Sequence, residues 1–213
     1  MTRRNWILAL GLIALTASAL LAQAPARKPA SPAGTAATQL GGKYVAAQGG
    51  GQRYEGGKWI EVTYSRPIKR GRQNLFGMGA DYGKAVSDDA PVWRAGANQT
   101  TRLKTEIPLV FDGKTLPAGE YSVFVELKET GWTLIFSNWP AQEKYDPNNK
   151  AALWGSYGYT PDKDVLRVAM KLETLPFSMD EFTIAFIDMT ADGGKLAMMW
   201  DKTFASVPFK AGS

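Results

Sequence analysis

The residues best suited to chemistry lie in the segment Pro91–Thr101, whose sequence is PVWRAGANQTT. Its centre combines a large aromatic side chain, a guanidinium and a side-chain amide in Trp93, Arg94 and Asn98. An alternating apolar pattern, which is typical of a β-strand, begins near its end at Thr100. We therefore expect a loop at the entrance of a strand, a common position for binding residues.

More arginines and aromatic residues precede this segment in a glycine-rich stretch. Guanidinium groups bind carboxylates, phosphates and sugar hydroxyls, and aromatic faces stack on sugar rings or on guanidinium planes. The sequence therefore predicts a ligand-binding group, whose members are Arg66, Arg72, Tyr82, Trp93, Arg94 and Asn98.

The same residue types also fit a purely structural role. Arg94 and Arg72 can pair with nearby acids or backbone carbonyl groups and so hold a long loop in place. Asp81 and Asp88 are the candidate acids, and Trp93 would then fill the core. The residue types alone slightly favour this alternative. The direction in which the guanidinium of Arg94 points decides between the two.

The chain contains no histidine and no cysteine, which limits its chemistry. The usual zinc, copper and haem sites need these ligands, and Ser-His and Cys-His nucleophile pairs are excluded for the same reason. Oxygen ligands for calcium occur at three places, which are Asp88 with Asp89, Asp146 with Asn148 and Asn149, and Asp162 with Asp164. None has the spacing of a calcium-binding loop. The sequence predicts neither a metal nor another cofactor.

Paired carboxylates are the remaining route to catalysis. A glycosidase of this kind needs two acids across a cleft at a set separation. The candidate acids are Glu61, Asp81, Glu106, Glu126 and Glu143. Nothing in their spacing selects a pair, so a carbohydrate hydrolase or lyase is kept as an alternative to binding without catalysis.

The N-terminus has the pattern of a secretory signal peptide. Two arginines precede the apolar run Trp6–Leu21, and small residues follow it. This run is shorter than the roughly 20 residues of a membrane-spanning helix, so we expect cleavage rather than anchoring. The predicted signal peptide covers residues 1–22, with cleavage after Ala22, or after Ala24 in the alternative register.

The mature protein is then expected in the periplasm or outside the cell, without membrane contact after signal cleavage. Loss of Arg3 and Arg4 with the signal lowers the formal charge from +5 to about +3. Nucleic-acid binders usually show a concentrated basic stripe, which is not found here. No nucleic-acid partner is predicted, and the oligomeric state is left open.

A flexible, proline-rich leader is predicted over residues 23–30 and a single domain over residues 31–213. Short alternating runs separated by turns indicate strands. The clearest are Trp59–Tyr64, Tyr121–Leu127, Trp132–Phe136, Val165–Leu172, Phe182–Asp188, Leu196–Trp200 and Thr203–Phe209. Asp112-Gly113 favours a tight hairpin because both residues tolerate positive φ. About ten strands without an amphipathic helix predict an all-β antiparallel β-sandwich, with a jelly roll as one form of it.

Two glycine-containing stretches interrupt this pattern. Gly41–Gly57 is expected to form either a loose hairpin or an irregular insertion. Ile68–Val86 has four glycines and little periodicity, and it is expected to be a long ordered loop leading to Trp93. Long loops in compact domains are often functional.

Several short motifs occur in the order seen in a family of exported bacterial proteins. They are Ser31-Pro32, Tyr64-Ser65-Arg66-Pro67, Lys69-Arg70-Gly71-Arg72, Phe76-Gly77, Tyr82-Gly83-Lys84, Trp93-Arg94-Ala95-Gly96-Ala97-Asn98, Leu116-Pro117-Ala118-Gly119-Glu120-Tyr121-Ser122, Trp132 to Phe136 and Asp164-Val165-Leu166-Arg167-Val168. On these motifs the chain resembles the domain of unknown function 2911 family from about Ser31 to Phe209. The resemblance implies export, a single mostly-β domain and no established activity.

The chain departs from the family pattern in two places. A glycine-rich stretch lies between Val45 and Lys58, and Ala95 and Gln99 stand where the family pattern leads us to expect Thr and Glu. The missing acid at position 99 argues against acid or base catalysis by a carboxylate beside Asn98.

Three functions remain compatible with these observations. The first is a non-catalytic binding module for an anionic or polyhydroxylated ligand, such as a small molecule or a glycan. The second is an envelope enzyme that uses carboxylates on carbohydrate. The third is a structural partner in an envelope assembly.

Overall fold

The computed structural model describes residues 29–212 of the chain. The predicted signal peptide and residues 23–28 of the predicted leader lie outside the described residues. The strands are β1 (Ala33–Leu40), β2 (Lys43–Ala46), β3 (Gln52–Glu55), β4 (Lys58–Ser65), β5 (Thr101–Thr105), β6 (Leu109–Phe111), β7 (Lys114–Leu116), β8 (Gly119–Lys128), β9 (Gly131–Ser137), β10 (Asp164–Ile187) and β11 (Gly193–Ala211). The helical elements are one short helix, α1 (Lys84–Ser87), and 3-10 turns at Gly79–Asp81 and Pro161–Lys163. Within the described residues, none of these helices is long and apolar enough to cross a membrane.

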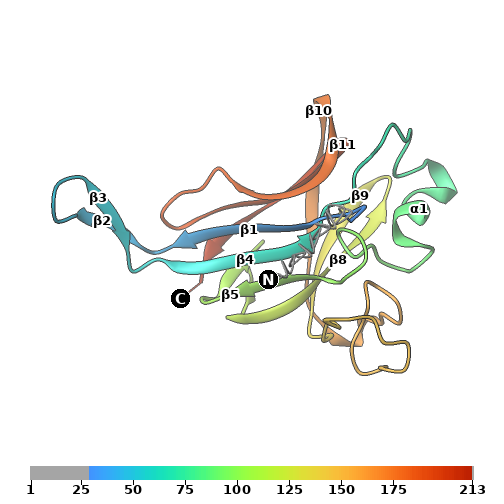
Figure 1. The fold of residues 1–213 in the computed structure, drawn as a ribbon, viewed down its shortest axis with the longest axis horizontal. Helices are drawn as coiled ribbons and strands as arrows, with labels where there is room; N and C mark the ends of the chain where they lie inside the picture. The colour runs from blue at the N-terminus through green and yellow to red at the C-terminus, as the bar shows by residue number, and fades with distance from the viewer. Residues whose placement is uncertain (1–28, 213) are drawn as a thin grey trace, which may run out of the picture.

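Nine strands form one antiparallel sheet in the order β1-β4-β5-β8-β9-β10-β11-β6-β7, and β2 pairs with β3 in a separate ribbon. The first part of β10 pairs with β9 and the rest pairs with β11, so β10 carries the sheet from one layer to the other. Figure 1 shows the β10–β11 hairpin running over β1 and β4, with the β2–β3 ribbon projecting at one end. The predicted all-β, antiparallel, sandwich-like fold is confirmed.

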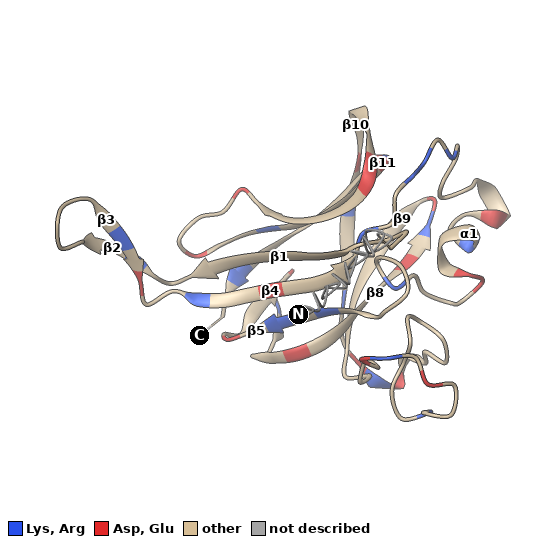
Figure 2. Ribbon diagram, in the orientation of Figure 1, with Lys and Arg blue, Asp and Glu red and all other residues tan. Residues whose placement is uncertain are grey.

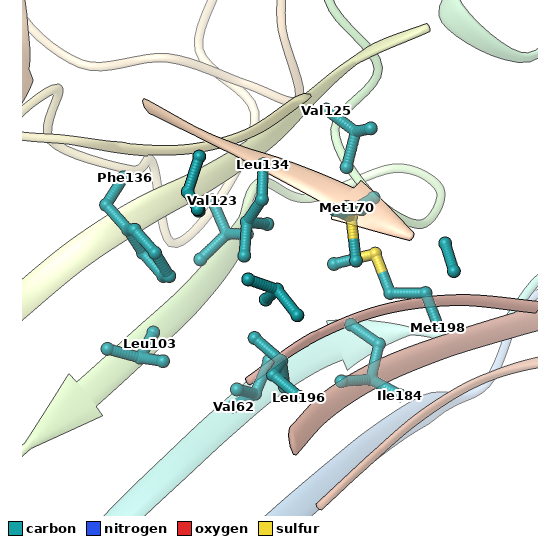
Figure 3. Packing of buried hydrophobic residues seen from close by; sticks show 14 of the residues in the cluster. Val62, Leu103, Val123, Val125, Leu134, Phe136, Met170, Ile184, Leu196 and Met198 are labelled. Carbon is teal, nitrogen blue, oxygen red and sulfur yellow. The ribbon is translucent and has the colours of Figure 1, made fainter. Parts of the chain in front are cut away.

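The core fills the space between these two layers. Alternate residues of each strand point inward, as period-two side-chain geometry requires. Figure 3 shows Val62 and Leu103 from one layer near Ile184, Leu196 and Met198 from the other. All five are at most 3% exposed. Since no disulfide is present, burial of these apolar side chains is the main source of stability.

The last four predicted strands are halves of two long ones. The predicted strands Val165–Leu172 and Phe182–Asp188 both belong to β10, except for Asp188, which follows its end. The predicted strands Leu196–Trp200 and Thr203–Phe209 both belong to β11. The ladder between β10 and β11 shifts register between Thr174 and Met179 and again before Thr183, without ending. Bulges of this kind break the alternation in the sequence while the chain continues in the same pair of strands. In the sequence, the interruption between Leu172 and Phe182 therefore resembles a turn between two separate strands.

The glycine-rich stretch after β1 adopts the hairpin alternative. β2 and β3 pair in register from Lys43 opposite Glu55 to Ala46 opposite Gln52. Gly49, Gly50 and Gly51 connect them, all with positive φ, between 82° and 98°. Only glycine takes three such conformations in succession at little cost. The ribbon is thus a defined element that stands away from the sandwich (Figure 1).

Candidate functional site

The Trp93 segment is a loop held against the edge of the core. Trp93 exchanges two backbone hydrogen bonds of 2.8 Å with Val125 in β8. Its indole is fully buried, and its Nε1 donates to the carbonyl of Gly96 at 3.0 Å. Thr101 closes the loop by donating from Oγ1 to the carbonyl of Ala95 at 2.8 Å. The predicted loop at a strand entrance is therefore what the structure contains.

Trp93 lies inside an aromatic cluster. Its ring is 4.8 Å from Phe182, 5.9 Å from Phe76, 6.0 Å from Trp132 and 6.2 Å from Trp200, measured between ring centres. Such pairs add to the stability that burial provides. Trp93 is thus a core residue that anchors the loop, as the structural interpretation of the sequence expected.

Arg94 points into the protein and connects three loops. Its side chain is 7% exposed, and Nη2 lies 2.6 Å from Oδ2 of Asp88. Nη1 donates to the carbonyl of Asn98 at 3.4 Å. The guanidinium also lies over the ring of Tyr157, 5.1 Å from its centre, and the Tyr157 hydroxyl donates to the same Asp88 oxygen at 3.0 Å. The segments around residues 88, 98 and 157 therefore meet at one cation.

The loop that carries Tyr157 fits closely against Arg94. Gly155 has a φ of 64°, and a Cβ atom at this position would lie 2.8 Å from Nη1 of Arg94. A side chain would be strained by the backbone and would also collide with the guanidinium. In this tight environment Nε of Arg94 is buried and has no hydrogen-bond acceptor within residues 29–212.

Arg72 reaches the same region from the long loop and stays exposed. Its Nε and Nη2 donate to the carbonyls of Lys69 and Ile68, both at 3.0 Å. The guanidinium carbon lies 5.4 Å from the centre of the Trp200 ring, which gives a cation–π contact. Arg72 is therefore oriented by backbone carbonyls and an indole, and no acid in the described residues forms an ion pair with it.

A pocket of about 260 Å³ opens between these residues. Arg72, Trp93, Arg94 and Asn98 line it, so four of the six predicted site residues share one concavity. The other lining residues are Ser31, Pro67, Ala85, Val86, Asp88, Gly96, Ala97 and Trp200. Two arginines face one carboxylate, which leaves the lining cationic. Asn98 is exposed and has a φ of 58°, a left-handed conformation that asparagine tolerates.

The other two predicted residues lie elsewhere. Nη2 of Arg66 forms an ion pair of 2.5 Å with Glu181. The hydroxyl of Tyr82 accepts a 3.0 Å hydrogen bond from Nε1 of Trp132, and its ring stacks on Phe76. Burial raises the pKa of Tyr82, although the hydrogen bond from Trp132 opposes the shift. Neither residue lines the pocket, so the predicted group of six divides into four and two.

The sequence analysis missed two aromatic residues of the site, of which Trp200 lines the pocket and Tyr157 contacts Arg94 outside its lining. Tyr157 contacts Arg94 from a loop more than 60 residues later in the chain, and Trp200 contacts Arg72 from β11. The order of the strands in the sheet brings both residues next to the Trp93 segment. No local sequence pattern indicates that they are neighbours. Asp88, by contrast, was one of the two acids predicted as possible partners of Arg94 and Arg72, and it lies six residues before Arg94.

Most of the candidate catalytic acids already form an ion pair with a lysine or arginine, or accept a hydrogen bond from a backbone N–H group. Asp81 pairs with Lys84, Glu126 with Lys128 and Arg167, and Glu143 with Arg102, while Glu106 accepts from the backbone of Trp59. Glu61 and Glu120 line a depression of about 220 Å³ and are separated by Lys104 in the register of β4, β5 and β8. Figure 2 shows acidic and basic positions interspersed on these strands. Among residues 29–212, no three acids gather to hold a metal ion.

Comparisons with known proteins identify the family of this chain and no individual relative. Neither the curated proteins nor the solved structures contain a match to the chain. The family model described as "Protein of unknown function (DUF2911)" matches residues 48–209, which cover β3 and the strands from β4 to β10 together with most of β11. This match confirms the resemblance seen in the motifs, and the chain belongs to the DUF2911 family.

Proposed function

We propose that this protein is an exported, non-catalytic binding module that holds a small anionic or polyhydroxylated ligand in the pocket between Arg72 and Arg94. Export is inferred from the N-terminal sequence pattern. The binding role is inferred from the pocket and its charges. The structural role of Arg94 and this binding role are compatible, because one guanidinium can bind on both of its edges.

The observation that carries the proposal is the incomplete pairing of Arg94. Its guanidinium is nearly buried, yet Nε has no acceptor within the described part of the chain. An unpaired buried donor is costly, and a charged one more so. The negative charge of a ligand in the adjoining pocket would offset the cost of burying this cation, and a ligand oxygen would form a charge-assisted hydrogen bond with the exposed guanidinium of Arg72.

The size and charge of the pocket define the class of ligand. Drug-sized ligands usually occupy roughly 300–1,000 Å³, and this pocket has about 260 Å³. Arg72 and Arg94 together exceed the single carboxylate of Asp88 by one positive charge. A small carboxylate, a phosphate ester or an acidic sugar therefore fits better than a large or cationic molecule.

Thermal unfolding of the purified mature protein provides the test. Sodium phosphate, citrate, glucuronate and mannitol are added at concentrations up to 10 mM, with sodium chloride keeping the ionic strength constant. Saturation at about 100 times Kd adds about 2.7 kcal/mol to the free energy of unfolding, which raises Tm by roughly 5–10 °C in a domain of this size.

Arg72→Gln is the informative variant because Arg72 is exposed, and we expect the fold to tolerate its loss. We expect the Tm increase to disappear in this variant. Arg53→Gln is the matched control, since Arg53 is an exposed arginine on β3 outside the pocket. The proposal is refuted if none of the four compounds shifts Tm, or if the shift survives in Arg72→Gln.

The two alternatives have less support. A carbohydrate hydrolase or lyase needs two acids, and Asp88 is the one carboxylate among the described residues that line this pocket. That carboxylate already accepts hydrogen bonds from Arg94 and Tyr157. Nothing in the lining of this pocket favours a structural role in an envelope assembly over the binding of a ligand.

A further inference from the structure

A second concavity lies beside the β2–β3 ribbon. Figure 1 shows this ribbon at the opposite end of the molecule from α1. The volume of the concavity is about 630 Å³. Its lining residues come from β1, the β2–β3 ribbon, the start of β4 and the turn after β10. The lining residues are Thr38, Gln39, Gly42, Lys43, Tyr44, Tyr54, Trp59, Met189, Thr190 and Ala191. We call it the ribbon groove.

Aromatic rings stand exposed along the ribbon groove. Tyr44 is 69% exposed and Trp59 is 50% exposed, although side chains of this size usually bury most of their surface. Tyr54 lies next to Tyr44, edge to face, with 5.2 Å between the ring centres. Three aromatic side chains therefore present faces or edges to one open groove.

The Tyr54 ring is held in place before any ligand arrives. The Tyr54 hydroxyl accepts a hydrogen bond of 3.0 Å from the backbone of Gly42. A Cβ atom at Gly42 or at Gly57 would come within 2.5 Å of the Tyr54 ring, so the ring packs directly on two glycines. Trp59 belongs to β4, which pairs with β1. Its backbone N–H donates a hydrogen bond of 2.8 Å to Oε2 of Glu106. The Tyr54 ring and the backbone at Trp59 therefore lose little conformational entropy on binding.

The polar groups of the groove are mostly neutral. Gln39 provides an amide, while Thr38 and Thr190 provide hydroxyls. Lys43 is the one charged side chain among the described lining residues, and no described acid lines the groove. The surface therefore offers aromatic faces together with neutral donors and acceptors.

We propose that the ribbon groove binds a segment of a carbohydrate chain built from pyranose sugars. The C–H face of a pyranose ring carries weak positive charge and packs on the negative face of an aromatic ring. Its equatorial hydroxyls point sideways, where an amide and hydroxyl groups can pair with them. An apolar protein partner would instead favour aliphatic side chains, and Met189 is the only long aliphatic-type one in the described lining.

This site is separate from the Arg72–Arg94 pocket. The two concavities share no lining residue, and they differ in charge and in the chemistry of their side chains. The inference therefore does not depend on the proposed function. Either site can fail its test while the other passes.

Native affinity electrophoresis tests the proposal directly. The protein has a sequence pI near 9.3, so the gel is run at acidic pH toward the cathode. The gels contain hydroxyethyl cellulose, laminarin, galactomannan or xylan, and bovine ribonuclease serves as a basic non-binding reference. We expect at least one of these polysaccharides to retard the protein.

Trp59→Ala and Tyr44→Ala each remove one aromatic platform. We expect either change to raise the apparent dissociation constant about tenfold or more. Phe177→Ala is the matched control, because Phe177 is an aromatic residue with 55% exposure that lies on β10 away from the groove. This control should be retarded like the original protein. Equal Tm values of the three variants would show that the fold is retained.

Three results would overturn the proposal. The first is migration unchanged by all four polysaccharides. The second is retardation that is equal in Trp59→Ala and in the original protein. The third is self-association in analytical ultracentrifugation that Trp59→Ala abolishes, without polysaccharide binding, which would make the groove a contact between two copies of the chain.

Discussion

Replacing Arg94 by methionine separates the two roles of this side chain. Methionine keeps most of the length and apolar volume of arginine but removes the charge and the donors. The change breaks the ion pair with Asp88 and the contact of the guanidinium with the ring of Tyr157. The three loops that meet at Arg94 then lose their common partner.

The expected cost follows from these contacts. Asp88 is 58% exposed, so its ion pair is screened and contributes about 1 kcal/mol or somewhat more. The contact with Tyr157 adds about 0.5–1 kcal/mol. Removal of the unpaired Nε group offsets part of this loss. We expect Arg94→Met to lower the free energy of unfolding by about 1–2 kcal/mol.

Urea unfolding followed by tryptophan fluorescence measures the change. Arg72→Met is the matched comparison, because Arg72 lines the same pocket but is exposed and has no ion pair in the described residues. Loss of its contact with Trp200 should cost about 0.5–1 kcal/mol, less than the loss at Arg94. A double-mutant cycle of Arg94→Met with Asp88→Asn should give a coupling of about 1 kcal/mol. If Arg94→Met costs no more than Arg72→Met and the coupling is zero, Arg94 does not connect the loops.

Two further changes test the environment of the site and of the sheet. Gly155→Ala should destabilise the protein by about 1–3 kcal/mol more than Gly113→Ala, because both positions have positive φ while only the first would place Cβ against Arg94. The hydrogen bond from Lys128 is the largest effect that lowers the pKa of Glu126 in the folded state. Stability from Glu126 is therefore present above its unfolded pKa of about 4.3 and is lost as pH falls through the lower folded value. The difference in free energy of unfolding between the original protein and Glu126→Gln should accordingly be full at pH 6 and shrink below pH ~4, and a pH-independent difference would contradict this reasoning.

The sequence predicted those parts of the fold that depend on neighbouring residues. The Asp112-Gly113 hairpin is present between β6 and β7 with φ values of 46° and 72°, as the two residue types indicated. The length of β10 was not predictable, because its irregular stretch contains Pro176 and is held by hydrogen bonds to β11 and to Pro67 and Lys69. Long-range pairing of this kind overrides the local pattern.

In the candidate site, too, some features depend on residues close in sequence and others on long-range strand pairing. This difference indicates which residue determines ligand selectivity. Local composition brought Arg72, Arg94 and Asn98 into one group, but only the sheet order places Tyr157 under Arg94 and Trp200 under Arg72. Arg94 is fixed from three sides, so its charge is a constant feature of the pocket. Arg72 is held only by backbone carbonyls and a ring face, and it keeps its charge available to solvent. Discrimination between ligands should therefore depend on Arg72, whereas Arg94 keeps the pocket in shape for it.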